Sequence, residues 1–216
     1  MDTRDKRVLF AKWLRDPLRI GAVLPSGAAL ARAMAKAADP ARPGLVVELG
    51  GGTGAVTRAL LKSGISPSNL VIIERDEGLY RLLVQRFPLA RVILGDAMRV
   101  KDLVRHGAGP VKAVVSGLPL LTMSPRIQAI LLRQSFALMG DHGIFVQFTY
   151  GPASPVPERR LKRLGLEAKL AKRVWPNVPP ATVWRFTKAA PVDTVPRKRR
   201  IGFFERIERA GASFSA

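Results

Sequence analysis

The 216-residue chain contains no cysteine and only two histidines, His106 and His142. Without thiols it forms no disulfide, performs no thiolate catalysis and holds no thiolate-ligated zinc, and two histidines make a histidine-based metal site a poor expectation. No apolar run reaches the eighteen residues that a bilayer-spanning helix needs, and no apolar segment follows the basic N-terminus as it would in a signal peptide. We therefore predict no metal, no disulfide framework and no transmembrane segment.

Acidic residues are scarce, because 16 Asp and Glu stand against 36 Lys and Arg, which gives a net charge of +20. The excess lies at both ends of the chain. Residues 156–216 hold 15 basic and 5 acidic side chains, and the first twenty residues hold six and three. Such a surface attracts polyanions, and both nucleic acid and anionic lipid are consistent with it. The hydrophobic share of 47% is sufficient for one domain with a real core.

Short apolar runs alternate with helical patterns through the middle of the chain. Strands are expected at 45–49, 70–73, 92–94, 111–115 and 143–149, followed by an antiparallel pair at 166–172 and 182–187. Helices are expected at 57–63, 76–87 and 125–139, the last with Ser124 as its cap and Pro125 at its first position. Continuous apolar strands are typical of strands buried on both faces. The pattern predicts an α/β, Rossmann-like domain with a mostly parallel seven-stranded sheet and helices on both faces.

The strongest motif is a glycine turn between the first strand and the next helix, with the sequence Glu48-Leu49-Gly50-Gly51-Gly52-Thr53-Gly54. Glu74 ends the second strand, twenty positions after Gly54, where a carboxylate can accept hydrogen bonds from both hydroxyls of a ribose. Dinucleotide folds favour Gly-x-Gly-x-x-Gly, whereas here the glycines alternate and an acid precedes them. An acid at this place suits a cationic ligand and would repel a pyrophosphate.

This pattern resembles motif I of the class I methyltransferases, which implies that S-adenosylmethionine is the cofactor and S-adenosylhomocysteine the product. By the same resemblance, Asp96 at the end of the third strand would hold the adenine amino group. The cofactor-binding residues expected on this basis are Ser26, Glu48, Gly50, Gly52, Thr53, Gly54, Glu74, Asp96, Ala97 and Ser116.

The fourth strand ends in Ser116-Gly117-Leu118-Pro119-Leu120-Leu121, where amino-methyltransferases place the acceptor nitrogen. The rRNA adenine dimethyltransferases carry Asn-x-Pro-aromatic there, but this chain has neither the Asn nor the aromatic residue. A flipped base needs an aromatic platform, so nucleic acid is disfavoured as substrate without being excluded.

From residue 10 to residue 187 the chain resembles the bacterial phospholipid N-methyltransferases. Three further motifs carry this resemblance: Gly21-Ala22-Val23-Leu24-Pro25-Ser26, Thr149-Tyr150-Gly151-Pro152 and Pro179-Pro180-Ala181-Thr182-Val183-Trp184. The family implies stepwise methylation of phosphatidylethanolamine toward phosphatidylcholine at the cytoplasmic face of the inner membrane.

Tyr150, after the fifth strand, is predicted to be a catalytic residue at the ligand-bearing edge of the sheet. Its ring can hold a methylated ammonium by cation–π attraction, although a packing role would also explain a tyrosine there. Ser116 is the second catalytic candidate. Gly117, Leu118 and Pro119 are expected to line the same substrate site.

Residues 1–20 are expected to form a basic amphipathic helix that binds membrane and covers the site, with residues 21–190 as the methyltransferase domain and 191–216 as a basic tail. Phe10 and Trp13 fall on its apolar arc and Lys12 and Arg15 outside it. A helix packed on the domain as a structural cap explains the same pattern. The expected partners are an anionic membrane surface and its phospholipid, and we infer no protein partner.

Overall fold

The computed structural model describes residues 25–104, 109–175 and 180–190; the side chains of Pro25 and Ser26 are not part of this description. The predicted helix at 1–20 and the predicted tail at 191–216 therefore lie outside the described residues. Within the described ranges, no helix is long and apolar enough to cross a bilayer.

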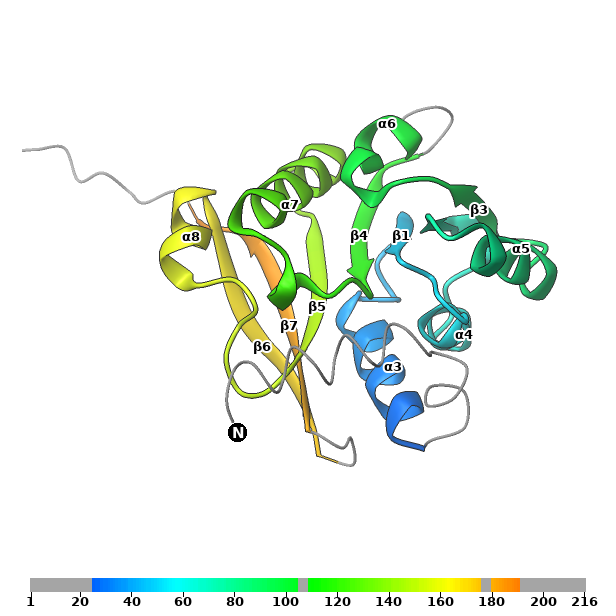
Figure 1. Ribbon diagram of the computed structural model, residues 1–216, viewed down its shortest axis with the longest axis horizontal. Coiled ribbons are helices and arrows are strands. Elements are labelled where there is room, and N and C mark those ends of the chain that lie inside the picture. Colours follow the sequence, from blue (N-terminus) through cyan, green and yellow to red (C-terminus); the bar gives the residue numbers. More distant parts are fainter. Residues whose placement is uncertain (1–24, 105–108, 176–179, 191–216) are drawn as a thin grey trace, which may run out of the picture.

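One seven-stranded sheet forms the centre of the molecule, with the strand order β3-β2-β1-β4-β5-β7-β6 (Figure 1). Five neighbouring strands are parallel, and β7 pairs antiparallel with both β5 and β6, which confirms the mixed sheet with an antiparallel edge. The strands are β1 (Leu45–Leu49), β2 (Leu70–Glu74), β3 (Arg91–Leu94), β4 (Val111–Ser116), β5 (Ile144–Tyr150), β6 (Leu166–Val174) and β7 (Ala181–Lys188).

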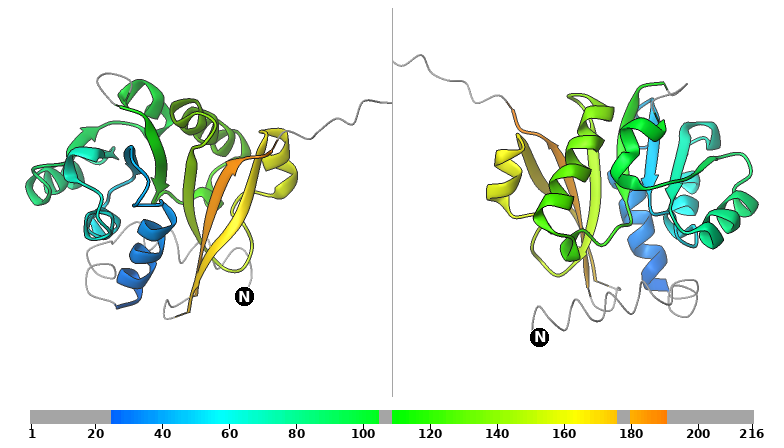
Figure 2. Two further views of the ribbon diagram at one scale, coloured as in Figure 1. Left: turned by 180° about the vertical axis from the view of Figure 1, so that it is seen from behind. Right: turned by 45° about the horizontal axis from the view of Figure 1, so that its top comes forward.

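Helices cover both faces of this sheet (Figure 2). They are α3 (Pro25–Ala37), α4 (Ala55–Lys62), α5 (Glu77–Arg86), α6 (Val100–Val104), α7 (Pro125–Met139) and α8 (Glu158–Arg163), with short 3₁₀ turns η1 (Pro67–Asn69), η2 (Ala97–Arg99) and η3 (Leu120–Thr122). Side chains of α3, α4 and α5 belong to one hydrophobic cluster, and those of α6, α7 and α8 belong to the other. The sheet is thus the middle layer of three.

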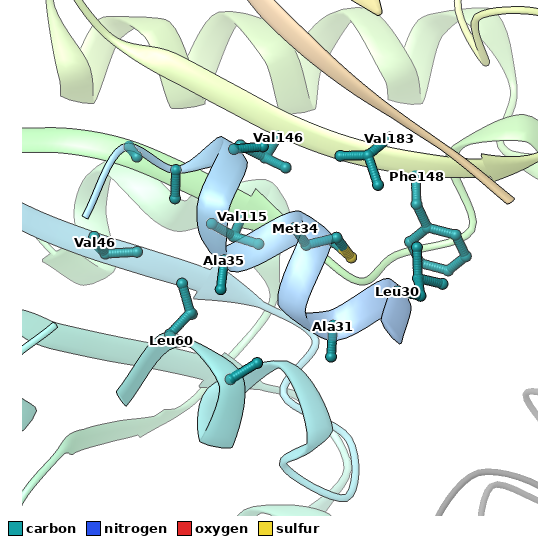
Figure 3. Close-up of a cluster of buried hydrophobic side chains, with 14 of the residues drawn as sticks. Leu30, Ala31, Met34, Ala35, Val46, Leu60, Val115, Val146, Phe148 and Val183 are labelled. Atoms are coloured by element: carbon teal, nitrogen blue, oxygen red, sulfur yellow. The ribbon is translucent and has the colours of Figure 1, made fainter. Parts of the chain in front are cut away.

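Helix α3 was not anticipated from the sequence, yet it is central to the core. Met34 on this helix is fully buried, and the helix packs against Val146 and Val183 of the sheet and beside Leu60 of α4 (Figure 3). Proline at its first position and its alanine-rich sequence suit a helix start and interior. The motif that contains Ser26 therefore leads into a structural helix.

The expectation that the strands are buried on both faces is wrong at the edge of the sheet. The third strand is not buried on both faces, because β3 is the edge strand of the sheet and both Arg91 and Leu94 are exposed. In α5, only Leu83 is fully buried, while Leu79 and Leu82 are half-buried. An edge position removes one neighbouring strand, so its apolar residues are covered from one side only.

The helix starts follow the local signals in the sequence. Asp76 caps α5 by accepting a hydrogen bond from the Leu79 N–H at 2.9 Å. Ser124 precedes α7, Pro125 takes its first position, and the Ser124 hydroxyl accepts from the Ile127 N–H. The side-chain oxygens satisfy amides that have no partner within the helix.

Candidate cofactor and acceptor site

The glycine turn joins β1 to α4 at the carboxyl edge of the parallel strands. Gly50, Gly52 and Gly54 have φ values of 75°, 55° and 83°, in the left-handed region that favours glycine. The Gly50 N–H donates to the carbonyl of Ile73 at 2.8 Å, which ties the turn to the end of β2. The Arg86 guanidinium donates to the Thr53 carbonyl at 2.8 Å from the end of α5.

The turn leaves room for a ligand at one position in particular. A Cβ added to Gly54 would lie 2.4 Å from the Phe87 ring, so that glycine is required by packing. A Cβ added to Gly52 would meet no atom within 4 Å. The backbone of Gly52 therefore borders open space, as expected of a turn whose backbone closely approaches a cofactor.

Glu74 lies at the end of β2 beside this turn. One of its carboxylate oxygens accepts from the Gly52 N–H at 2.9 Å, and the other accepts from the N–H groups of Arg75 and Asp76 at 2.9 and 3.0 Å. Three backbone donors fix the carboxylate in place, and the oxygen that accepts from Gly52 keeps one lone pair for a further bond. This preorganised acceptor fits a hydroxyl of a ribose.

The adenine end of the predicted site is formed after β3. Asp96 is exposed and caps η2 by accepting from the Met98 N–H at 2.9 Å, and the next residue, Ala97, is buried. Leu94 is the register partner of Glu74 and is 46% exposed. Leu94 thus offers an exposed apolar surface between Glu74 and Asp96. This arrangement fits an adenine ring against Leu94, with its ribose at Glu74 and its amino group at Asp96.

Glu48 has a different environment from Glu74. Its side chain is buried, and one oxygen accepts a 2.6 Å hydrogen bond from the Thr57 hydroxyl of α4. Burial raises the pKa of Glu48 to about 8, so the group is mostly neutral at pH 7. The expected attraction to a cationic ligand therefore requires that the ligand first lower this pKa and release the proton.

The loop after β4 lies directly against the glycine turn. The Gly117 N–H donates to the Leu49 carbonyl at 2.8 Å, and a Cβ on Gly117 would come within 2.8 Å of the Gly50 carbonyl oxygen. Ser116 is fully buried, and its hydroxyl accepts from the Leu118 N–H at 3.3 Å. The structure thus joins the two predicted motifs. The Ser116 hydroxyl holds the backbone of this loop, and its catalytic role stays a prediction.

Tyr150 is the last residue of β5 and is half-buried at the same edge of the sheet. Its ring makes an edge-to-face contact with the Phe148 ring, with centroids 5.6 Å apart. The loop residues and Tyr150 are thus carried by the adjacent parallel strands β4 and β5. Ser26 lies in the first turn of α3, and its side chain is outside the described set.

Two buried glutamines that the sequence analysis missed hold this loop. Gln147 of β5 donates to the Leu118 carbonyl at 3.0 Å, and Gln128 of α7 donates to the Leu120 carbonyl at 2.7 Å. Arg160 of α8 donates to the Gln128 side-chain oxygen at 2.6 Å. A single polar residue within an apolar strand, as at 147, is the one signal that could have indicated such a tether.

Searches against known proteins place the chain in a broader context. No family model matches it. It is 28% identical over 153 residues to an ornithine lipid N-methyltransferase of Singulisphaera acidiphila, which covers 69% of the chain and 80% of that protein. It is also 29% identical over 113 residues to a ribosomal RNA small subunit methyltransferase A of Chlorobium chlorochromatii, a match that covers 50% of this chain and 42% of that one.

Two solved structures are similar in fold. The 1,6-didemethyltoxoflavin-N1-methyltransferase of Burkholderia thailandensis, solved with bound S-adenosylhomocysteine, has a TM-score of 0.61 at 16% identity over 85% of this chain and 87% of that one. A TehB-like methyltransferase from Corynebacterium glutamicum has a TM-score of 0.54 at 18% identity over 87% of this chain and all of that one. The chain thus has the fold of the class I S-adenosylmethionine-dependent methyltransferases, and the sequences similar to it are those of methyltransferases, which together support S-adenosylmethionine-dependent methyl transfer as its activity.

Proposed function

We propose that the protein is a lipid N-methyltransferase. It transfers methyl groups from S-adenosylmethionine to the head-group amine of phosphatidylethanolamine and of its mono- and dimethyl derivatives, at an anionic membrane surface. Phosphatidylcholine is the final product of this series. The proposal is supported by the similarity to an ornithine lipid N-methyltransferase, whose named substrate is also a lipid.

The observation that carries the choice of substrate is the loop after β4. Leu120 occupies the position where an adenine methyltransferase would have its aromatic residue. This leucine is buried, with 1% of its surface exposed, and its carbonyl is bound by Gln128. A flipped base would find no ring to stack on in this loop, whereas an aliphatic ammonium needs none.

When bound, S-adenosylmethionine supplies a methyl carbon to the amine nitrogen as its carbon–sulfur bond breaks, and the bonding electrons remain on the departing thioether sulfur. Glu74 and Asp96 would hold its ribose and adenine ends. The loop formed by Gly117, Leu118 and Pro119 would position the acceptor amine, and positioning two bound reactants can supply most of the rate.

Tyr150 offers its ring to the ammonium of the methylated head group, which keeps a positive charge after each step. The acceptor must lose a proton before it attacks. His142 lies before β5, at the amino ends of the parallel strands and away from the acceptor site, where its carbonyl accepts a hydrogen bond from Arg42. We therefore assign the proton to water.

The test is incubation of the protein with labelled S-adenosylmethionine and four separate acceptors. These are anionic vesicles that contain phosphatidylethanolamine, vesicles that contain ornithine lipid, vesicles of phosphatidylcholine alone, and total RNA. The proposal requires label in phosphatidylethanolamine products and none with phosphatidylcholine alone. Label in ornithine lipid only would show that the substrate is an amine lipid other than phosphatidylethanolamine.

A nucleic-acid methyltransferase is the second candidate. The net charge of +20 and the similarity to ribosomal RNA small subunit methyltransferase A favour it. Label in RNA, with none in any lipid, would establish this alternative.

A further inference from the structure

The far edge of the sheet carries exposed apolar and basic side chains at the end of a long hairpin. The β6–β7 hairpin runs beside β5 and ends level with it, because Tyr150 pairs with Ala181 and Ala181 pairs with Val174 (Figure 1). Leu170 is 49% exposed and Trp175 is 69% exposed, and Lys172 and Arg173 lie exposed between them. We call these four residues the hairpin patch.

A local irregularity of β6 places two of these residues on one face. The register shifts between Leu170 and Lys172, so Leu170 lies opposite Trp184 and Arg173 lies opposite Thr182. Trp184 and Thr182 are two positions apart on β7 and therefore share a face. Leu170 and Arg173 consequently share that face, and the exposed Trp175 follows the last residue of β6. A bulge of this kind in an edge strand also discourages pairing with another strand.

The hairpin patch lies close to the acceptor site. The Thr182 hydroxyl, opposite Arg173, donates to the carbonyl of Gly151 at 2.7 Å, and Gly151 directly follows Tyr150. Arg173 is separated from β5 only by β7, so two strand spacings, or about 10 Å, divide them. A surface that contacts the patch therefore comes within a head-group length of Tyr150.

The charge of the patch is free to act on an external partner. Lys169, nearby on the same strand, is paired with Glu167 at 2.7 Å. Neither Lys172 nor Arg173 forms an ion pair within the part of the chain that the structure describes. Arg173, a cation with no ion pair among the described residues, lies on the same face as Leu170, and Lys172, opposite Val183, extends the positive charge to the other face. Cations and exposed apolar side chains at one edge of the sheet match the interface of an anionic bilayer, where phosphate groups lie above hydrocarbon.

We infer that the hairpin patch is a docking surface for anionic phospholipid bilayers and presents the head group to the acceptor site. The inference rests on the proposed lipid substrate, and it is separate from the predicted N-terminal helix. Leu170 favours a bilayer over RNA, because an aliphatic side chain gains from hydrocarbon and has no stacking role on a base.

The test uses the full chain with two variants and two matched controls. Lys172→Gln/Arg173→Gln removes two patch charges, and Lys62→Gln/Arg133→Gln removes two exposed charges from helices on the faces of the sheet. Trp175→Ala removes the patch aromatic, and Leu89→Ala removes a 78% exposed apolar side chain at the opposite edge. Binding is measured by sedimentation with vesicles of phosphatidylcholine and phosphatidylglycerol.

The charge variant is expected to bind about 30-fold more weakly, since each basic residue near an anionic surface contributes about a sixfold factor. Trp175→Ala is expected to bind about tenfold more weakly, the effect of roughly 60 Å² of lost apolar contact. Both controls should stay within about twofold of wild type, because they lie away from the patch. Patch variants that bind vesicles as well as their controls would overturn the inference.

Methyl transfer to phosphatidylethanolamine in neutral detergent micelles separates this inference from the proposed function. A wild type that methylates no lipid in micelles or vesicles refutes the proposed function. A wild type active in both, with patch variants that keep the full vesicle rate, refutes only the docking role. The expected result is patch variants that are slow on vesicles and normal in micelles.

Discussion

Gly52→Ala is the sharpest test of where the cofactor lies. Gly52 has a φ of 55°, and its added Cβ would enter open space without meeting any protein atom within 4 Å. Without cofactor, the variant should therefore lose only the free energy that a residue with a side chain needs to adopt the left-handed backbone, about 1–2 kcal/mol. For a chain of this length that corresponds to a fall in Tm of about 2–8 °C.

The effect on the cofactor is larger and has a separate cause. If S-adenosylmethionine lies against the Gly52 backbone, the new methyl group must displace it, at a cost typical of overpacking, about 1–3 kcal/mol. The dissociation constant should then rise by about 5- to 150-fold. Isothermal titration calorimetry measures the affinity, and thermal unfolding without cofactor measures the stability.

Gly165→Ala is the matched control. Gly165 has a φ of 67° and equally open surroundings, but it lies between α8 and β6, the outermost strand on the side of the sheet away from β3. It should lose similar stability and bind S-adenosylmethionine normally. Normal binding by Gly52→Ala, or an equal loss in both variants, would refute the assignment of the cofactor to this turn.

Three further predictions concern acids and tethers of the site. Glu74→Ala should weaken S-adenosylmethionine binding by at least tenfold in calorimetry and lower stability by about 1–3 kcal/mol, because three backbone donors lose their acceptor; unchanged affinity would contradict it. Glu48, with its pKa raised from 4.5 to about 8, favours folding most at low pH, and this contribution disappears as the pH rises from 4.5 to 8. In urea unfolding, Glu48→Gln should therefore gain stability relative to wild type between pH 6 and pH 8, and a constant difference would exclude the raised pKa. Gln128→Leu should reduce kcat on micellar lipid without changing cofactor affinity, since it frees the Leu120 carbonyl but leaves the glycine turn intact; a loss of cofactor affinity would point to general misfolding.

The glycine turn and the strand-end acids were predictable because their signals are local. Each lies where an apolar run stops, and parallel strands bring such ends to one edge of the sheet. The antiparallel pair was also predictable, since no helix separates its strands. The placement of β7 between β5 and β6 was not, because strand order depends on packing between segments distant in the sequence.

The burial of Glu48 and Ser116 was beyond the sequence for a related reason. A carboxyl next to a glycine turn can face the ligand or the core, and the Thr57 hydroxyl decides for the core. Nothing in the spacing of 48 and 57 distinguishes the two orientations. Helix α3, in contrast, has local signals in the sequence, with Pro25 at its first position and several alanines in its interior.

The tethers of the post-β4 loop bear on how the enzyme selects its acceptor. The loop is held from three independent elements, by Gln147 on β5, by Gln128 on α7 and by the Gly117 contact with β1. Such a loop cannot open widely to admit a base without breaking buried hydrogen bonds, each of which costs about 1–3 kcal/mol when left unsatisfied. A primary amine on a flexible head group needs no such opening. The rigidity of the loop therefore favours small aliphatic amines, which agrees with the proposed lipid head-group substrate.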